Sequence, residues 1–179
     1  GGYEIEKIGR NFPDLEFIYN ANWAKTGVLE SLYHARNLLN GPVIVSYGDI
    51  VYTKSVIERI INNKHHNGTT IAYDSTIISE KNNSKVRKNI VRINNNIIDD
   101  IGFLPANSKT SGEFIGLAYF DGKTTDFIKN FYKDIYSDLR GKAFQQADKI
   151  ERGYLTDLLR YLKNEGLQLS AVDIKKNWA

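Results

Sequence analysis

Strand-like and helix-like patterns of apolar residues alternate along the first half of this chain. Residues 15–20, 43–47 and 69–75 are compact runs rich in β-branched and aromatic side chains, which are typical of strands. Between them, residues 26–39 and 53–64 repeat apolar side chains at helical spacing. The strand that begins at residue 43 shows no polar face, so we expect it to be buried on both sides. This order with short connections predicts right-handed crossovers and a parallel sheet.

The second half predicts a hairpin followed by further strands and helices. Two short Ile/Val runs flank three consecutive asparagines, which are turn residues. We expect a helix after Tyr3, the hairpin at 88–103, strands at 113–120 and 167–174, and helices at 124–139 and 154–165. The whole pattern predicts a single domain over residues 1–179. Its expected fold is a Rossmann-like α/β fold with a mostly parallel mixed sheet, flanking helices and an inserted β-hairpin.

Composition excludes several classes of protein. The 179 residues are 41% hydrophobic and 25% charged, as in ordinary globular domains, and no apolar run approaches the ~20 residues of a membrane span. The net charge of +3 is too small to indicate a nucleic-acid partner. Cysteine is absent, which excludes disulfides and thiolate metal sites, and a cytoplasmic setting is the simplest expectation. Because methionine is absent too, we expect the chain to be a fragment.

The carboxylate of Asp49 is the first candidate for chemistry, because it follows the strand that begins at Val43. In open α/β sheets, ligands bind outside the carboxyl ends of the strands. An aspartate there suits Mg²⁺, which takes one or two protein carboxylates and completes its shell with water and phosphate oxygens. The alternative is a turn or helix-capping aspartate that holds no ligand.

Three other groups of polar residues each have a ligand-binding interpretation and a structural one. His65 and His66 are adjacent, so they cannot present one helix face to one metal ion, and a solvated loop is favoured. The basic stretch 80–88 could contact phosphates, although charge runs are usually solvated. Tyr73 and Asp74, at the end of the third strand, could hold an ammonium group between an aromatic face and a carboxylate, or could simply pack.

Two longer segments resemble a known family of enzymes. Residues 20–52, NANWAKTGVLESLYHARNLLNGPVIVSYGDIVY, combine an Asn-led loop, a Gly-x-x-x-Ser-Leu helix start and a strand that closes in Gly-Asp. Residues 112–120, GEFIGLAYF, add a Gly-Glu-x-x-Gly strand. Together they resemble the nucleotidyltransferases that activate sugar phosphates and phosphocholine. They look most similar to phosphocholine cytidylyltransferases and to the nucleotidyltransferase domains joined to phosphoenolpyruvate mutases in phosphonate pathways.

The resemblance implies which residues surround the nucleotide. Asp49 matches the aspartate that binds Mg²⁺ on the nucleotide phosphates. Gly27 matches a glycine whose backbone lies close to the base, and such an approach needs a residue without Cβ. A plain glycine at a helix start is the alternative. Thr26 and Gly48, the neighbours of these two residues, are also expected at the nucleotide.

The resemblance also places an acceptor substrate. Glu113 matches a glutamate near the acceptor, although a surface carboxylate at a strand edge is an equal alternative. We expect Tyr73 and Asp74 to join it, because an aromatic face and negative charge favour a cationic acceptor over a neutral sugar.

Two features of the family fall outside this chain. Its glycine-rich phosphate loop precedes a residue like Gly1, and its second metal-binding aspartate follows a Trp-x-Glu-Ile-Asp pattern that begins here with Trp178 and then stops. Truncation explains both absences better than decay of the site. We therefore expect this chain to hold the middle of an active site.

These observations predict an Mg²⁺-dependent enzyme that transfers CMP from CTP, or a nucleotidyl group from another NTP, to a small acceptor and releases pyrophosphate. The expected acceptor is a phosphate or phosphonate such as phosphocholine or 2-aminoethylphosphonate. The resemblance also implies fusion to, or association with, a phosphoenolpyruvate mutase domain. The alternatives are a sugar-phosphate nucleotidyltransferase and a non-catalytic nucleotide-binding domain, since fold alone does not fix function.

Overall fold

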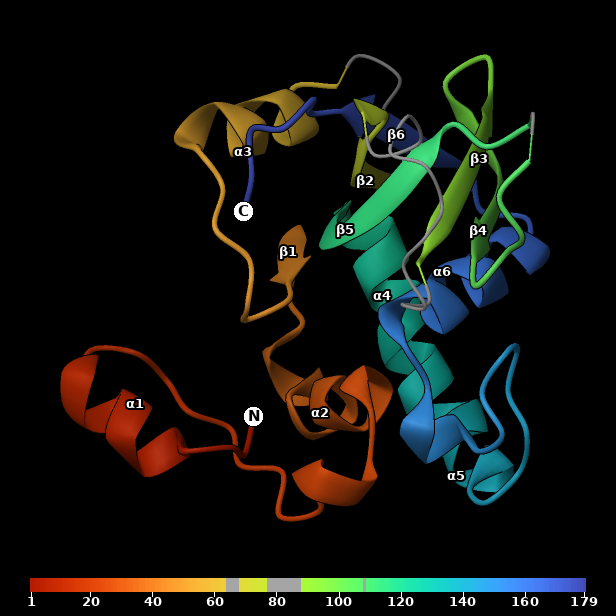
Figure 1. The fold of residues 1–179 in the computed structure, drawn as a ribbon. Helices are drawn as coiled ribbons and strands as arrows, with labels where there is room; N and C mark the ends of the chain where they lie inside the picture. The colour runs from red at the N-terminus through yellow and green to blue at the C-terminus, as the bar shows by residue number, and fades with distance from the viewer. Residues whose placement is uncertain (64–67, 77–87, 108) are drawn as a thin grey trace. The chain divides into compact units, whose positions relative to one another are not determined.

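A computed structural model describes most of the chain (Figure 1). The described residues are 1–63, 68–76, 88–107 and 109–179. The two adjacent histidines and nearly all of the basic stretch that the sequence singled out lie outside these ranges, so both interpretations stay predictions.

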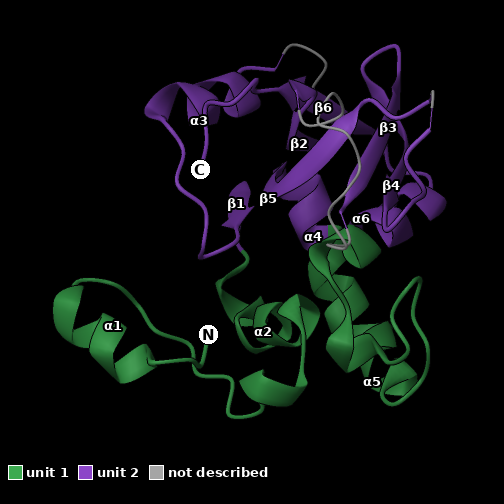
Figure 2. Ribbon diagram, in the orientation of Figure 1, with its two compact units in different colours: residues 1–39, 127–158 green, residues 40–126, 159–179 purple. Residues whose placement is uncertain are grey.

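The described chain divides into two compact units (Figure 2). Unit 1 comprises Gly1–Leu39 and Phe127–Leu158, and unit 2 comprises Asn40–Asp126 and Leu159–Ala179. Each unit therefore combines two stretches that are distant in the sequence. The single nucleotidyltransferase domain expected over the whole chain stays a prediction, and the two units are described separately below.

Unit 2 contains a six-stranded sheet whose pairings close a ring. The strands are β1 (Val43–Ser46), β2 (Thr69–Asp74), β3 (Ile90–Asn94), β4 (Ile97–Gly102), β5 (Gly112–Phe120) and β6 (Leu169–Asp173). Their order is β1-β5-β2-β6-β4-β3, and β3 also pairs with β5. The ring closes because β5 is long enough to pair with β1 through residues 117–120 and with β3 through residues 112–113 on the same edge.

The sheet is mixed, as predicted, but it is not mostly parallel. Among the described strands, β2 and β6 form the parallel pair, and the other ladders are antiparallel. The prediction failed because β5 inserts between β1 and β2 and pairs antiparallel with both. Strands β1, β2 and β6 still run in one direction, so their carboxyl ends share one edge of the sheet with the amino end of β5.

Two sequence expectations about strands are wrong. Strand β1 lies at the end of the strand order and alternates between half-buried and exposed residues, so it is not buried on both faces. Residues 15–20 form no strand in the structure. Among the described residues, their ladder-like hydrogen bonds join Gly1 alone, whose amino group donates to Ile18 O at 2.9 Å and whose carbonyl accepts from Asn20 N at 2.8 Å. One residue on the partner side is too short to build a ladder.

The hairpin that the sequence predicted is confirmed. Strands β3 and β4 pair antiparallel across Asn95 and Asn96, which have φ angles of 49° and 63°. Two successive positive φ angles match the backbone twist of a tight hairpin, and asparagine tolerates them better than most residues.

The predicted helices are present, with one internal change. They are α1 (Ile5–Asn11), α2 (Val28–His34), α3 (Lys54–Ile61), α4 (Gly122–Asn130), α5 (Tyr136–Leu139) and α6 (Leu155–Asn164). Helices α4 and α5 are joined by a π-helical turn, η4 (Phe131–Ile135). A π turn brings residues five apart onto one face, and the buried Phe131 and Tyr136 have that spacing. No helix among the described residues is long and apolar enough to cross a membrane.

Each unit has its own apolar core. In unit 2, Val56 and Ile60 of α3 pack on sheet residues that include Ala72 and Leu117. In unit 1, aromatic side chains of η4, α5 and the segment after them pack against one another in tilted and edge-to-face arrangements. Ring centroids lie 5.2 Å apart for Phe131–Tyr132, 5.2 Å for Tyr132–Tyr136 and 5.6 Å for Phe131–Phe144.

Candidate functional site

The residue after β1 packs tightly on β5, and the exposed Asp49 follows two residues later. The backbone N–H of Tyr47 donates to Gly116 O at 2.9 Å, and the Tyr47 ring occupies the place that a Cβ on Gly116 would need. Gly116 has a φ of 88°, so both its conformation and its contact favour glycine. Gly48 and Asp49 then form an exposed turn at the shared edge of the sheet. The Asp49 carboxylate is therefore accessible to a ligand.

The last residues of the chain lie beside the segment that follows Asp49. The backbone N–H of Val51 donates to Ala179 O at 2.8 Å, and the N–H of Ala179 donates to Val51 O at 2.9 Å. Tyr52 and Trp178 form the adjoining antiparallel bridge. The tryptophan that the sequence singled out as the start of a metal-binding pattern thus pairs with Tyr52, three residues after the candidate metal ligand Asp49.

Asp74 holds this terminal segment in place. Asp74 is 2% exposed, and its carboxylate accepts four hydrogen bonds. Oδ1 accepts from the backbone N and the hydroxyl of Thr76 at 2.8 and 2.7 Å. Oδ2 accepts from Lys176 N at 3.1 Å and from Trp178 Nε1 at 2.9 Å. Burial opposes ionisation of Asp74, but the hydrogen bonds from Thr76, Trp178 and Lys176 outweigh it and hold the pKa below its ordinary value.

The structure brings together two of the three residues expected at the acceptor. Asp74 lies opposite Glu113 across the β2–β5 ladder, and Tyr73 lies opposite Phe114. Because successive side chains of a strand point to opposite faces, the Tyr73 ring lies on the other face of the sheet from these two carboxylates. Burial raises the pKa of Glu113, the nearby Lys88 lowers it, and Asp74 raises it further. The Glu113 carboxylate lies 3.6 Å from the Lys88 ammonium, and both side chains remain about a quarter exposed. Glu113 is therefore the more accessible of the two carboxylates, whereas Asp74 is committed to the terminal segment.

Asp173 is a further carboxylate at this edge that sequence reasoning missed. It ends β6, whose carboxyl end lies beside that of β2. Burial raises the pKa of Tyr73, and the negative charge of Asp173 raises it further. It accepts hydrogen bonds from Ser75 N at 3.2 Å, Ser75 Oγ at 2.6 Å and Lys175 N at 3.3 Å. Its place at the end of a predicted strand was the available signal, and the same reasoning that selected Asp49 applies to it.

The loop that contains Thr26 and Gly27 belongs to unit 1 and is organised by a buried asparagine. Asn20 is fully buried, and its amide donates to Thr26 Oγ1 at 3.0 Å and to Ser31 Oγ at 3.2 Å. Its carbonyl oxygen accepts from Asn22 N at 2.9 Å. The leading asparagine of the family-like loop thus has a structural task, because it fixes the turn that leads into α2.

Gly27 lies against another stretch of backbone in the same unit. Its N–H donates to Glu151 O at 2.7 Å. A Cβ added to Gly27 would lie 2.5 Å from Gly153 O and 2.6 Å from Arg152 O. This contact accounts for glycine at position 27 without a nucleotide, and its place beside the base stays a prediction.

We expect Gly27→Ala to destabilise the protein by about 1–3 kcal/mol, because the clashing atoms are backbone and cannot rotate away. Urea denaturation followed by circular dichroism measures the change. Gly48→Ala is the matched control, since a Cβ there meets nothing within 4 Å, and its effect should stay within about 0.5 kcal/mol. Equal stability of both variants would show that the 151–153 backbone yields to the added methyl group.

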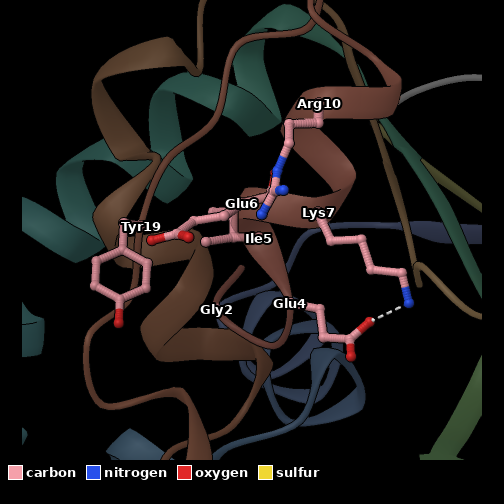
Figure 3. Close-up of a pocket in the computed structure, with 7 residues that line it drawn as sticks. All are labelled: Gly2, Glu4, Ile5, Glu6, Lys7, Arg10 and Tyr19. Carbon is pink, nitrogen blue, oxygen red and sulfur yellow. Dashed lines mark hydrogen bonds and ion pairs between the residues drawn. The ribbon is translucent and has the colours of Figure 1, made fainter.

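A separate hollow of about 510 Å³ lies along α1 in unit 1 (Figure 3). Glu6 and Arg10 of its lining project from one side of α1, and Lys7 pairs with Glu4 at 3.0 Å. Its lining carries two carboxylates and two cations, so its charges favour neither an anionic nor a cationic ligand.

Comparisons with known proteins identify relatives by sequence and by structure. No known family model matches the sequence. CTP:phosphoglutamine cytidylyltransferase of Campylobacter jejuni is 24% identical over 190 residues, which cover 99% of this chain and 74% of that protein. This relative carries the same class of activity that the sequence motifs predicted.

Solved structures share the fold. The inositol-1-phosphate CTP transferase from T. maritima has a TM-score of 0.65 and 14% identity, over 97% of this chain and 62% of that chain. The CTP:phosphocholine cytidylyltransferase from Streptococcus pneumoniae has a TM-score of 0.62 and 15% identity, over 96% of this chain and 64% of that chain. The present chain thus spans less than two thirds of either structure. The relatives support the family that the motifs predicted, the cytidylyltransferase-like nucleotidyltransferases.

Proposed function

We propose that the protein containing this chain transfers CMP from CTP to the phosphate of a small-molecule acceptor and releases pyrophosphate. The supporting observation is the shared edge of the sheet, where β1, β2 and β6 end and β5 begins. Asp49 follows β1, Asp173 ends β6 and Glu113 lies near the start of β5 at this edge, on a fold that cytidylyltransferases match along nearly the whole chain. A phosphate oxygen of the acceptor would attack the α-phosphorus of CTP, so an α–β phosphoanhydride bond breaks as the new anhydride bond forms.

We propose that Mg²⁺ binds at this edge of the sheet together with the nucleotide phosphates. The described residues contain no cluster of three or more potential metal ligands. A dedicated protein cage is not what Mg²⁺ requires when phosphates are present, because one or two carboxylates with water and phosphate oxygens complete its shell. The exposed Asp49 carboxylate meets that requirement. The ion would supply neutralisation of the negative charge that develops on the phosphates.

The remaining residues of the edge would position the two substrates. Asp74 fixes Trp178 beside Tyr52, which gives the segment after Asp49 a defined path. Such positioning lowers the entropic cost of bringing the acceptor oxygen to the α-phosphorus. The ion pair between Lys88 and Glu113 shows that this carboxylate can pair with an ammonium group. The amine of an acceptor could replace the Lys88 ammonium there.

We expect the full-length protein to release pyrophosphate from CTP faster with phosphocholine or 2-aminoethylphosphonate than with glucose 1-phosphate. The reason is the Glu113 carboxylate, which lies 3.6 Å from the Lys88 ammonium and could pair with an acceptor amine instead, whereas a neutral sugar offers it no cation. A competition assay with equal concentrations of the three acceptors measures the preference. Faster turnover of glucose 1-phosphate would transfer the proposal to sugar-phosphate nucleotidyltransferases. No turnover with any acceptor would favour a non-catalytic nucleotide-binding domain. The phosphonate setting and the mutase partner stay predictions.

A further inference from the structure

Unit 1 contains a basic pocket of about 370 Å³ that the proposed reaction does not use. It is enclosed by the end of α2 and the turn after it on one side, and by the α4–η4–α5 helix on the other. Its volume falls in the range of small-molecule sites. Its lining includes three cationic side chains and no carboxylate, and the lining residues are Tyr33, Arg36, Asn37, Lys129, Asn130, Tyr132, Lys133 and Ser137.

Arg36 is held in one orientation at this pocket. Its guanidinium carbon lies 4.1 Å from the centroid of the Tyr33 ring, and its Nη1 donates to Tyr33 O at 2.8 Å. The other face of Tyr33 stacks on Tyr136 at 4.7 Å and 15°. The Tyr136 hydroxyl donates to the buried Glu30 carboxylate at 2.5 Å. This hydrogen bond holds the Tyr136 ring in place, and with it the Tyr33 ring stacked on it. A guanidinium carries five N–H donors, so this anchoring leaves most of the fork for a ligand.

Lys129 and Lys133 provide the second cationic wall. Lys129 lies in the last turn of α4 and Lys133 in η4, and both line the pocket. Lys133 belongs to the π-helical turn η4, a feature that occurs frequently at functional sites. The two ammonium groups add positive charge to the wall that faces Arg36 in the pocket lining.

We propose that this basic pocket binds a small phosphorylated anion. The fork of Arg36 matches the geometry of phosphate oxygens, and lysine ammonium groups add point charges with rotatable donors. The amides of Asn37 and Asn130 and the Ser137 hydroxyl supply neutral donors around them. This ligand would be additional to the CTP and acceptor of the proposed reaction, because none of the pocket's lining residues is among those expected to contact either substrate.

Titration of the 179-residue chain with inorganic pyrophosphate in the presence of EDTA tests the pocket without a divalent metal. Calorimetry gives the affinity, and amide NMR shifts locate the binding. We expect saturable binding, with the largest shifts in the segments 33–37 and 129–137. The double variant Lys129→Gln/Lys133→Gln should bind at least about tenfold more weakly, since charged hydrogen-bond donors contribute strongly to anion binding.

The matched control is Lys142→Gln/Lys149→Gln, which removes the same charge from exposed positions of unit 1 outside the pocket. It should bind pyrophosphate within about twofold of the parent protein, because screening weakens the effect of distant exposed charges. Arg36→Lys keeps the charge but removes the fork and should also weaken binding. Absence of saturable binding by the parent protein would overturn the proposal. Equal weakening by the pocket and control variants would do the same, since it would indicate attraction to net charge alone.

Discussion

Replacement of Asp49 by asparagine should abolish most Mg²⁺-dependent release of pyrophosphate by the full-length protein while the fold stays intact. We expect turnover to fall at least about a hundredfold, because an amide cannot supply the negative charge that holds Mg²⁺ on the nucleotide phosphates. The Asp49 side chain is exposed, so the free energy of unfolding should change by less than about 0.5 kcal/mol. Steady-state kinetics across a range of Mg²⁺ concentrations, with thermal denaturation alongside, measures both effects.

The control for this experiment is Asp99→Asn, which removes one exposed carboxylate from β4 of the same unit. Turnover of this variant should match the parent protein. If Asp49→Asn retained parental turnover, or lost it only together with the fold, Asp49 would be a turn residue rather than a metal ligand. Recovery of activity at higher Mg²⁺ concentration would further support the assignment, since a weakened metal site responds to mass action.

Much of the element order could be predicted from the sequence, because each element carries its own local signal. The apolar spacing in 53–64 produced α3, and the asparagine run produced the β3–β4 turn. Strand direction could not be predicted in the same way. It depends on which strand inserts between β1 and β2, and the long strand β5 takes that place through pairings far apart in the sequence.

The candidate site residues divide in a similar way. Asp49 could be selected because it follows a strand, and Glu113 because its Gly-Glu-x-x-Gly strand resembles that of the family, and the roles of both stay predictions. The structural tasks of Asp74 and Gly27 were not visible, since Asp74 binds residues about a hundred positions away and Gly27 contacts the 151–153 backbone. Asp173 shows the converse case, because a local signal existed and was overlooked.

Replacement of Asp74 by asparagine should destabilise the protein by about 2–4 kcal/mol at neutral pH. The change keeps the size of the side chain, so no cavity forms. Both carboxylate oxygens of Asp74 accept two hydrogen bonds each, so the new NH₂ group must face two donors in either orientation. Buried donors without an acceptor are costly, and the indole of Trp178 or the backbone of Thr76 would lose its partner. Urea denaturation of the 179-residue chain measures the difference.

The pH dependence separates this mechanism from a general loss of packing. Because the folded pKa of Asp74 lies below its ordinary value, its ionised form contributes stability that is fully present above the unfolded pKa of about 4. That contribution is lost as the pH falls through the folded pKa, where protonated Asp74 resembles the asparagine variant. The stability gap between parent and Asp74→Asn should therefore be constant near neutrality and narrow below about pH 4. Asp99→Asn, which removes an exposed carboxylate, should show a gap of less than about 0.5 kcal/mol at either pH. A gap for Asp74→Asn that stays the same from neutral to acidic pH would mean that its hydrogen bonds do not depend on the ionised carboxylate.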